Sequence, residues 1–116
     1  GTSTHLGDIA ESQAIAKLFG DLDTNKNLKV SSTKSMHGHM LGATGAVESI
    51  VSILSVQNDV VPPTINHQDG DEDPEIDYSL NFTFNKAQKR VVRAAMSNTF
   101  GFGGQNASII FKKFCP

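Results

Sequence analysis

Several ionisable side chains lie close together in one short, glycine-rich stretch of the sequence. Residues 31–48 read SSTKSMHGHMLGATGAVE and contain Lys34, His37, His39 and Glu48. His39 is the best candidate for acid–base chemistry, because an imidazole exchanges protons near neutral pH. The alternative is a structural loop histidine. Lys34 and Glu48 could form an ion pair near His39, or could be two solvated surface charges.

The spacing His37-x-His39 invites a zinc interpretation. No third ligand is evident, because Cys115 lies in the terminal tail and His67 lies beside an acidic loop. We therefore predict no metal site. Cys115 is not a nucleophile candidate either, since no helix start is expected near it to lower the pKa of a thiol.

Residues 21–27 begin Asp-x-Asp-x-Asn, as a calcium-binding loop does. Such a loop needs a glycine at its sharp turn and a glutamate at its end. Lys26 and Ser32 stand at those two positions. The sequence thus argues against calcium binding.

Composition places the chain among globular proteins and excludes several classes of function. The 116 residues suffice for one small domain, with 38% hydrophobic and 19% charged residues. A net charge of -2 gives no electrostatic case for nucleic acid. No apolar run approaches the roughly 20 residues of a membrane span, and no signal peptide is visible. The absence of a starting Met leads us to expect a piece of a longer protein.

Periodicity predicts two helices, over residues 8–19 and 42–57, and we expect the second to be largely buried. Asp8 and Glu11 have the spacing of a capping box at the first helix. Strand patterns cover residues 28–32, 90–97 and 107–113, with an irregular strand over 78–84. The glycine-rich residues 98–106 then form a hairpin loop. Together these elements predict an α/β unit with a mixed sheet and packed helices.

Four blocks of residues occur in a fixed order along the chain. They are Gly1–Thr4 with Gly7, Asp8 and Glu11; Ser31–Met36 with Gly38 and His39; Gly42–Glu48; and Asn98–Asn106. With these blocks the chain resembles, over residues 1–116, the C-terminal portion of the β-ketoacyl-acyl carrier protein synthases of the thiolase superfamily. The resemblance is closest to the type II enzymes that elongate fatty acids, and a fifth block, residues 61–66, supports it.

This resemblance implies a partial thiolase-like fold, incomplete without an N-terminal half, and an acyltransferase activity. In that family a malonyl unit loses CO2, and the resulting carbanion condenses with an acyl group on a Cys thiol. The malonyl unit arrives on the phosphopantetheine arm of acyl carrier protein, so the resemblance implies no separate cofactor.

The resemblance also implies individual roles. His39 matches the second active-site histidine, which assists decarboxylation, and Lys34 matches the active-site lysine with Glu48 as its carboxylate partner. Phe102 matches the gating phenylalanine, whose backbone N–H helps to form an oxyanion hole. Implied substrate contacts are Thr2 and Thr4, which hold the phosphopantetheine arm, with Phe100, Gly101 and Gly103 of the glycine loop.

Two departures matter. The family's nucleophilic Cys lies far upstream, and its first active-site histidine directly precedes the block at residues 1–4. His5 follows that block, so it is not that histidine, and His37 inherits no role. We therefore expect the 116-residue chain alone to be inactive, and to be marginally stable or self-associating because partner strands are missing.

Alternatives within and beyond the superfamily stay open. One is a polyketide ketosynthase domain, and another is a non-catalytic relative that acts as a dimer partner or chain-length module. The resemblance implies a homodimeric full-length protein, in the bacterial cytoplasm or in an organelle. We expect the acidic carrier protein to dock on basic residues, with Lys86, Lys89 and Arg90 as candidates.

Overall fold

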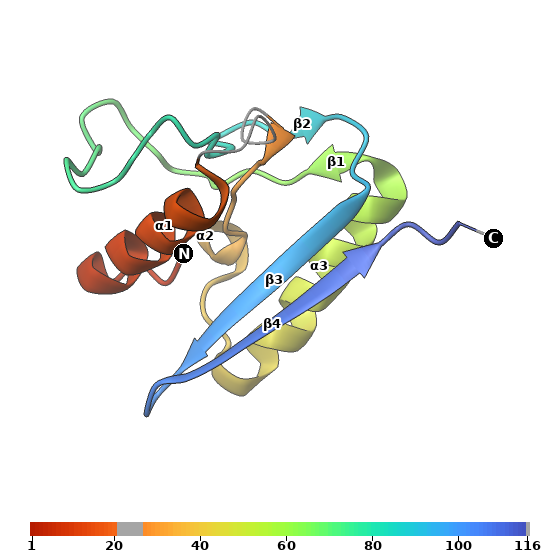
Figure 1. The fold of residues 1–116 in the computed structure, drawn as a ribbon, viewed down its shortest axis with the longest axis horizontal. Helices are drawn as coiled ribbons and strands as arrows, with labels where there is room; N and C mark the ends of the chain where they lie inside the picture. The colour runs from red at the N-terminus through yellow and green to blue at the C-terminus, as the bar shows by residue number, and fades with distance from the viewer. Residues whose placement is uncertain (21–26, 116) are drawn as a thin grey trace. The chain divides into compact units, whose positions relative to one another are not determined.

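A computed structural model describes residues 1–20 and 27–115, which form two compact units. Unit 1 contains residues 1–38 and 62–87, and unit 2 contains residues 39–61 and the chain from residue 88 onward. Figure 1 shows the elements in chain order. The calcium-loop hypothesis falls largely on residues 21–26, which lie outside the described residues.

Unit 1 is built on helix α1 (His5–Phe19) and a short helix α2 (Lys34–His37). α1 ends before Gly20 as predicted, but it begins three residues earlier than residue 8. Asp8 is therefore inside the helix, and the capping-box prediction is wrong. Thr4 is the N-cap residue, with an extended backbone at φ −105° and no side-chain cap bond.

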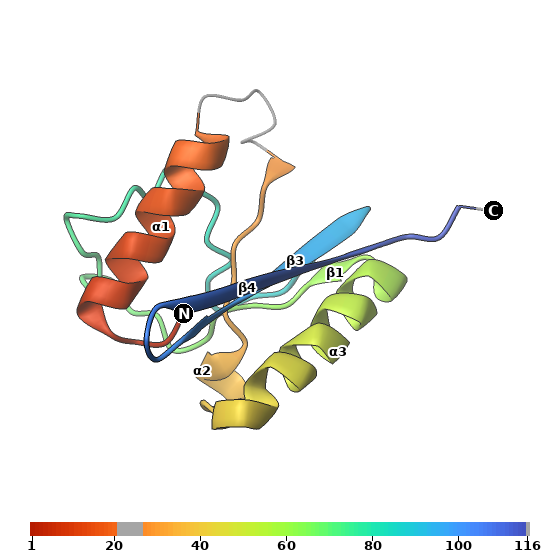
Figure 2. The same ribbon diagram turned by 60° about the horizontal axis from the view of Figure 1, so that its bottom comes forward.

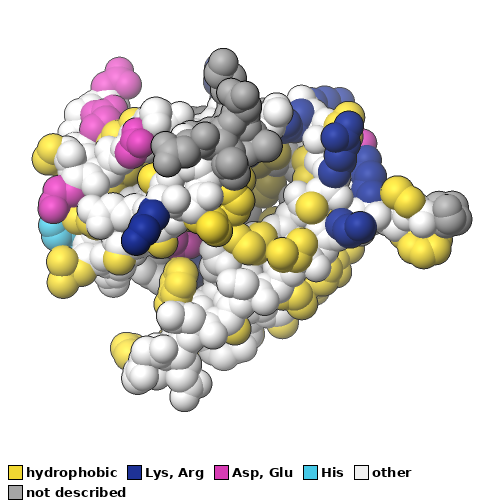
Figure 3. Space-filling view, viewed as in Figure 1, with side chains coloured by type: hydrophobic (Ala, Val, Ile, Leu, Met, Phe, Trp, Pro, Cys, Tyr) yellow, Lys and Arg dark blue, Asp and Glu magenta, His cyan; other side chains and the backbone are white. Residues whose placement is uncertain are grey.

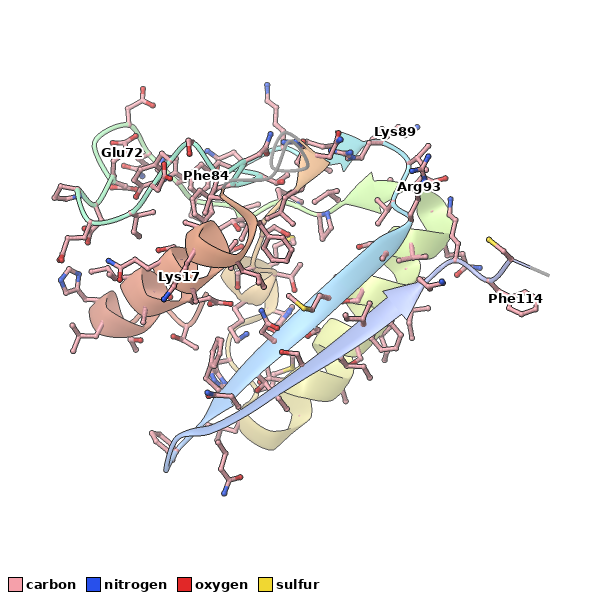
Figure 4. All side chains as sticks on the ribbon, in the orientation of Figure 1. Lys17, Glu72, Phe84, Lys89, Arg93 and Phe114 are labelled. Carbon is pink, nitrogen blue, oxygen red and sulfur yellow. The ribbon has the colours of Figure 1, made fainter. Side chains whose placement is uncertain are left out.

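The rest of unit 1 is irregular backbone held by isolated bridges and stacked rings. Val30 pairs with Phe82, and Thr64 pairs with Phe84, both as single parallel bridges. The predicted strand over residues 28–32 is thus reduced to one bridge residue. Phe84, labelled in Figure 4, stacks on the His67 ring at a centroid distance of 3.9 Å.

Unit 2 is a β-hairpin with a helix along it. Strands β3 (Ala94–Gly101) and β4 (Gln105–Lys112) pair antiparallel from Ala94↔Lys112 to Gly101↔Gln105. Helix α3 (Thr44–Asn58) packs against both strands, as Figures 1 and 2 show. A single 3-10 turn, η2 (Leu41–Ala43), precedes α3. The hairpin and both long helices confirm the predicted α/β class.

A second sheet, of two strands, lies at the C-terminal end of α3. β1 (Val60–Val61) pairs antiparallel with β2 (Gln88–Lys89). Both ladders of the described residues are antiparallel, and parallel pairing is confined to the two bridges of unit 1.

Asp59 joins α3, the approach to β3 and the end of β4. It caps α3 in the left-handed conformation at φ 57°, which Asp tolerates better than most residues. Its carboxylate accepts hydrogen bonds from Lys113 Nζ at 2.6 and 2.7 Å and from Val92 N–H at 2.8 Å. The Lys113 ammonium, and then the Val92 amide, hold the pKa of the Asp59 carboxyl below its usual range.

Few apolar side chains are buried. Within the described residues, the buried hydrophobic side chains are Ile9, Val56, Leu80 and Val92. The prediction that α3 is largely buried is wrong for this chain, because the hairpin covers only one side of the helix. Ile50, Ile53 and Leu54 of α3 are 57%, 45% and 48% exposed.

Candidate active site

The predicted site residues fall into two sets, one in each unit. Thr2, Thr4 and Lys34 belong to unit 1, whereas His39, Glu48 and Phe102 belong to unit 2. Each set has an internal geometry of its own. Lys34 and Glu48 belong to different units, so their pairing stays a prediction.

His39 opens a tight turn, residues 39–44, that we call the His39 corner. The backbone N–H of Leu41 donates to His39 Nδ1 at 3.0 Å, and the Thr44 hydroxyl lies 3.2 Å from the same nitrogen. Leu41 adopts φ 50°, a left-handed conformation that is unfavourable for a leucine. The turn is therefore held in place by its hydrogen bonds.

These bonds determine the tautomer of His39. A backbone amide can only donate, so Nδ1 must be the acceptor and the ring proton resides on Nε2. Thr44 strengthens the arrangement, because its oxygen accepts the Met40 N–H at 2.8 Å while its hydroxyl proton faces Nδ1. Thr44 is 4% exposed, whereas His39 is exposed. The corner thus presents a fixed Nε2–H donor at the protein surface.

Glu48 lies one helical turn after Thr44 on α3, and it is partly buried. Residues four apart share a helix face, so Glu48 projects from the face that carries Thr44. The sequence analysis missed Thr44. A hydroxyl residue at the start of a predicted helix, five residues after a candidate histidine, was the signal that could have found it.

His37 has the opposite environment. In unit 1 its Nδ1 lies 2.8 Å from the Gly38 carbonyl, and its Nε2 lies 2.9 Å from the Thr33 hydroxyl. A carbonyl only accepts, so Nδ1 donates. Both ring nitrogens are used within the α2 turn. Within the described residues, no three His, Cys, Asp or Glu side chains are placed to hold a metal ion.

Residues 1–4 form a second arrangement, the Thr strap, which folds back on the first turn of α1. The Asp8 carboxylate accepts the Thr2 N–H at 3.1 Å, and Ser3 takes φ 62°. The Thr2 and Thr4 hydroxyl oxygens are 3.1 Å apart, and both side chains are exposed. Asp8 is therefore an anchor of the strap and not the cap that its position in the sequence suggested.

His5 directly follows the strap and contacts Asp73 of the acidic loop, residues 68–74, and Glu75 just after it. Its Nδ1 lies 3.1 Å from Asp73 Oδ2, and its Nε2 lies 3.9 Å from Glu75 Oε2. Its contacts are with carboxylates of unit 1.

Phe102 stands at the tip of the β3–β4 hairpin. Gly101 pairs with Gln105, so residues 102–104 form a three-residue loop, and Gly103 and Gly104 take φ 84° and 79°. Such positive angles favour glycine. The Phe102 side chain is fully exposed, and Phe100 is 50% exposed. The predicted hairpin is confirmed, but its loop is shorter than the predicted residues 98–106, because residues 98–101 and 105–106 pair within β3 and β4.

The fold and these features define the class of protein: a partial thiolase-like fold that carries a histidine corner and a glycine hairpin. The chain belongs to the β-ketoacyl synthase family. The family profile "Beta-ketoacyl synthase, C-terminal domain" matches residues 1–68.

Named relatives agree with this assignment. The chain is 52% identical over 114 residues to 3-oxoacyl-[acyl-carrier-protein] synthase 2 of Staphylococcus aureus, covering 98% of this chain and 26% of that protein. It is 46% identical to a putative mitochondrial 3-oxoacyl-[acyl-carrier-protein] synthase of Schizosaccharomyces pombe, covering 97% of this chain and 26% of that protein. The chain thus spans about a quarter of these relatives' length.

Solved structures show the same fold. A β-ketoacyl synthase from Burkholderia phymatum matches with a TM-score of 0.85 and 39% identity, over 99% of this chain and 26% of that one. A type II polyketide ketosynthase, solved in complex with its acyl-carrier protein, matches with a TM-score of 0.86 and 32% identity, over 99% of this chain and 27% of that one.

Proposed function

We propose that the full-length protein containing this chain is a β-ketoacyl-[acyl carrier protein] synthase that extends fatty acids by two carbons. The His39 corner carries this proposal, because it supplies a preorganised hydrogen-bond donor of fixed tautomer. The 52% identity to a 3-oxoacyl-[acyl-carrier-protein] synthase 2 supports it.

In the proposed reaction, the C–C bond to the malonyl carboxylate breaks and CO2 leaves. The electron pair moves into an enolate whose oxygen was the thioester carbonyl. His39 Nε2–H donates a hydrogen bond to that oxygen as its charge develops. The enolate carbon then attacks an acyl thioester on a Cys of the preceding chain, a new C–C bond forms, and the Cys thiolate leaves.

Other residues of this chain have supporting roles in the proposal. The Phe102 N–H contributes to a second oxyanion hole, at the acyl thioester, and the Phe102 ring gates entry to the site. Lys34 and Glu48 form the charged pair on the malonyl side. The Thr strap holds the phosphopantetheine arm of the substrate, and Phe100, Gly101 and Gly103 of the glycine loop also contact the substrate.

The test is to compare the full-length protein with the isolated 116-residue chain in two assays, malonyl-carrier decarboxylation and condensation with an acyl primer. We expect turnover only from the full-length protein, since these 116 residues do not include the family's nucleophilic Cys, and Cys115 is not a nucleophile candidate. Absence of condensation by the full-length protein refutes the proposed function. Robust condensation by the isolated chain refutes our statement that this chain is inactive alone.

The exposed apolar side chains of α3 predict how the isolated chain behaves. Ile50, Ile53 and Leu54 would remain in water, so we expect self-association. Sedimentation velocity at several concentrations measures it. A concentration-independent monomer with a sharp melting transition contradicts this expectation.

Polyketide synthesis is the second candidate, because one matching structure is a ketosynthase in complex with a type II polyketide synthase acyl-carrier protein, at 32% identity. Another is a ketosynthase/chain length factor, at 34% identity. Their TM-scores of 0.86 hardly differ from the 0.85 of the Burkholderia phymatum β-ketoacyl synthase, and a shared fold does not separate the two chemistries. The higher identity to fatty-acid-type relatives favours elongation. Mass spectrometry of the products decides: one added two-carbon unit per cycle supports elongation, and a poly-β-keto chain supports the alternative.

A full-length protein without the upstream Cys would instead be a non-catalytic chain-length or dimer partner.

Acyl carrier protein is the proposed macromolecular partner. Lys86 of unit 1 and Lys89 of unit 2 are exposed, and Arg90 is partly exposed. Figure 3 shows Lys and Arg side chains gathered near β2 and the adjoining ends of β3 and β4, where Figure 4 labels Lys89 and Arg93. If this surface docks the carrier, Lys89→Glu raises KM for malonyl-carrier but leaves KM for malonyl-pantetheine unchanged. If Lys89→Glu leaves KM for malonyl-carrier unchanged, the carrier protein does not dock on this surface.

We also propose that the full-length protein is a homodimer, which light scattering of the purified protein tests.

We propose that the protein works in the cytoplasm if its source is bacterial and in an organelle if its source is eukaryotic. The relatives include bacterial proteins and one that is named mitochondrial. In the described part of the chain, no helix has the length and apolar character needed to cross a membrane.

A further inference from the structure

Gly7 lies in the first turn of α1, beneath the hydroxyl groups of the Thr strap. A Cβ atom built on Gly7 would collide with Thr4 Oγ1 and would lie 3.4 Å from Thr2 Oγ1. Real Cβ atoms essentially never accept the first of these contacts. A side chain at position 7 therefore has to displace the Thr4 hydroxyl, and with it the contact between the Thr2 and Thr4 hydroxyls.

Nothing in the helix itself calls for glycine at this position. The backbone of Gly7 does not have a positive φ, so it does not require glycine. Glycine is also a poorer helix former than alanine. The strap backbone is anchored, because the Asp8 carboxylate accepts the Thr2 N–H and the Thr4 carbonyl accepts the Asp8 N–H. The Thr4 side chain makes no capping bond, so its hydroxyl is the group that has to turn away. The missing side chain is thus explained by the hydroxyls above it.

The hydroxyl pair has a specific chemistry. Each hydroxyl has one proton and two lone pairs, and the 3.1 Å contact between Thr2 and Thr4 uses one proton and one lone pair. One proton and further lone pairs therefore face solvent, since both side chains are exposed. This combination suits a group that both donates and accepts, such as a secondary amide.

We infer that Gly7 is a positioning residue, which keeps the Thr2–Thr4 pair directed at a secondary amide of the substrate's arm. This inference rests on the proposed function, and it adds a residue that acts only through its lack of a side chain. Glycine is needed at position 7 because of the Thr4 hydroxyl. Removal of that hydroxyl should therefore remove the need for glycine.

The test is a double-mutant cycle in the full-length protein, with Gly7→Ala, Thr4→Ala and the double variant. We expect Gly7→Ala to lower kcat/KM for malonyl-pantetheine by about tenfold, mainly through KM, because arm hydrogen bonds are weakened. In the Thr4→Ala background the new Cβ meets Thr4 Cβ at an ordinary 3.8 Å. There Gly7→Ala should change kcat/KM less than about twofold.

A short malonyl thioester without the arm's amides separates positioning from general damage. Gly7→Ala should leave its kcat/KM unchanged if the hydroxyl pair contacts only the arm. The exposed Gln13 of α1 offers a control, Gln13→Ala, for substitution on the same helix. Equal losses with both substrates, or an equal loss in the Thr4→Ala background, overturn the inference.

Folding and function are also separable. If Gly7→Ala alone fails to fold but the double variant folds, the steric dependence on Thr4 is confirmed; if neither folds, the inference is wrong. A wild-type protein without condensing activity refutes the proposed function. The inference about Gly7 is then decided by melting temperatures, which should show the same non-additivity between positions 7 and 4.

Discussion

His37 and His39 stand two residues apart, yet their surroundings differ completely. In the α2 turn, His37 uses both ring nitrogens, donating to the Gly38 carbonyl and contacting the Thr33 hydroxyl. In the His39 corner, a backbone amide and the Thr44 hydroxyl both approach Nδ1. His37 is thereby tied into its own turn, whereas His39 presents Nε2–H to whatever binds at the surface.

The contrast shows that a histidine's chemical role is set by which nitrogen its neighbours occupy. Occupation of Nδ1 alone fixes a tautomer and leaves a directed donor. Occupation of both nitrogens makes the ring a structural link. The following predictions test that contrast in the full-length protein, from the largest expected effect to the smallest.

Replacement of His39 should have the largest effect. His39→Ala removes the oxyanion donor, so we expect malonyl decarboxylation to fall by about 100- to 1000-fold. The measurement is CO2 release from malonyl-carrier under saturating conditions. Activity within tenfold of wild type would remove His39 from the decarboxylation step.

Replacement of Thr44 tests whether the corner needs its buried hydroxyl. Thr44→Val leaves the Met40 N–H without its acceptor and removes one of the two donors to His39 Nδ1, so we expect kcat to fall about tenfold and stability to drop by about 1–3 kcal/mol. Thr44→Ser keeps the hydroxyl and is the matched control for both measurements. Equal kcat values for the Val and Ser variants would contradict this role.

Replacement of His37 should lower the free energy of unfolding but leave the catalysed reaction nearly unchanged. His37→Ala removes the two contacts in the α2 turn, so we expect a loss of about 1 kcal/mol in unfolding free energy. We expect kcat to stay within about twofold of wild type, as the expected range for a residue outside the reaction. A loss of activity comparable with that of His39→Ala would contradict the assignment of a structural role to His37 and a functional role to His39.

Acid should weaken the far end of α3 without altering the His39 corner directly. The pKa of Asp59 is lowered in the folded state by Lys113 and the Val92 amide, so its contribution to stability is present above the unfolded pKa. That contribution is lost as pH falls through the folded value. Lys113→Met should reduce the melting temperature near neutral pH and flatten its decrease in acid, with kcat unchanged where the protein is folded.

Differential scanning calorimetry between pH 2 and 7 measures this effect, with Lys112→Met as the control because Lys112 is exposed. Identical pH profiles for the two Met variants would show that the Asp59–Lys113 pair contributes nothing measurable. A changed kcat in folded Lys113→Met would show that the His39 corner depends on the distant end of the helix.

The sequence by itself determined the long elements and the list of candidate residues. Helical periodicity located α1 and α3 to within three residues at each end, and the glycines at 101, 103 and 104 marked the hairpin loop. These signals are local, since they depend on residues within a few positions of one another. His39 was singled out for the same reason, as an imidazole in a loop before a helix.

The tertiary structure decided where strands begin and what each polar group does. β3 begins at Ala94 rather than at residue 90 because the N–H groups of Arg90 and Val92 donate to Asp59 instead of to a strand. Asp8 became the anchor of Thr2, although its spacing from Glu11 was that of a cap. Hydrogen-bond partners distant in sequence leave no periodic trace, so only the folded chain shows them.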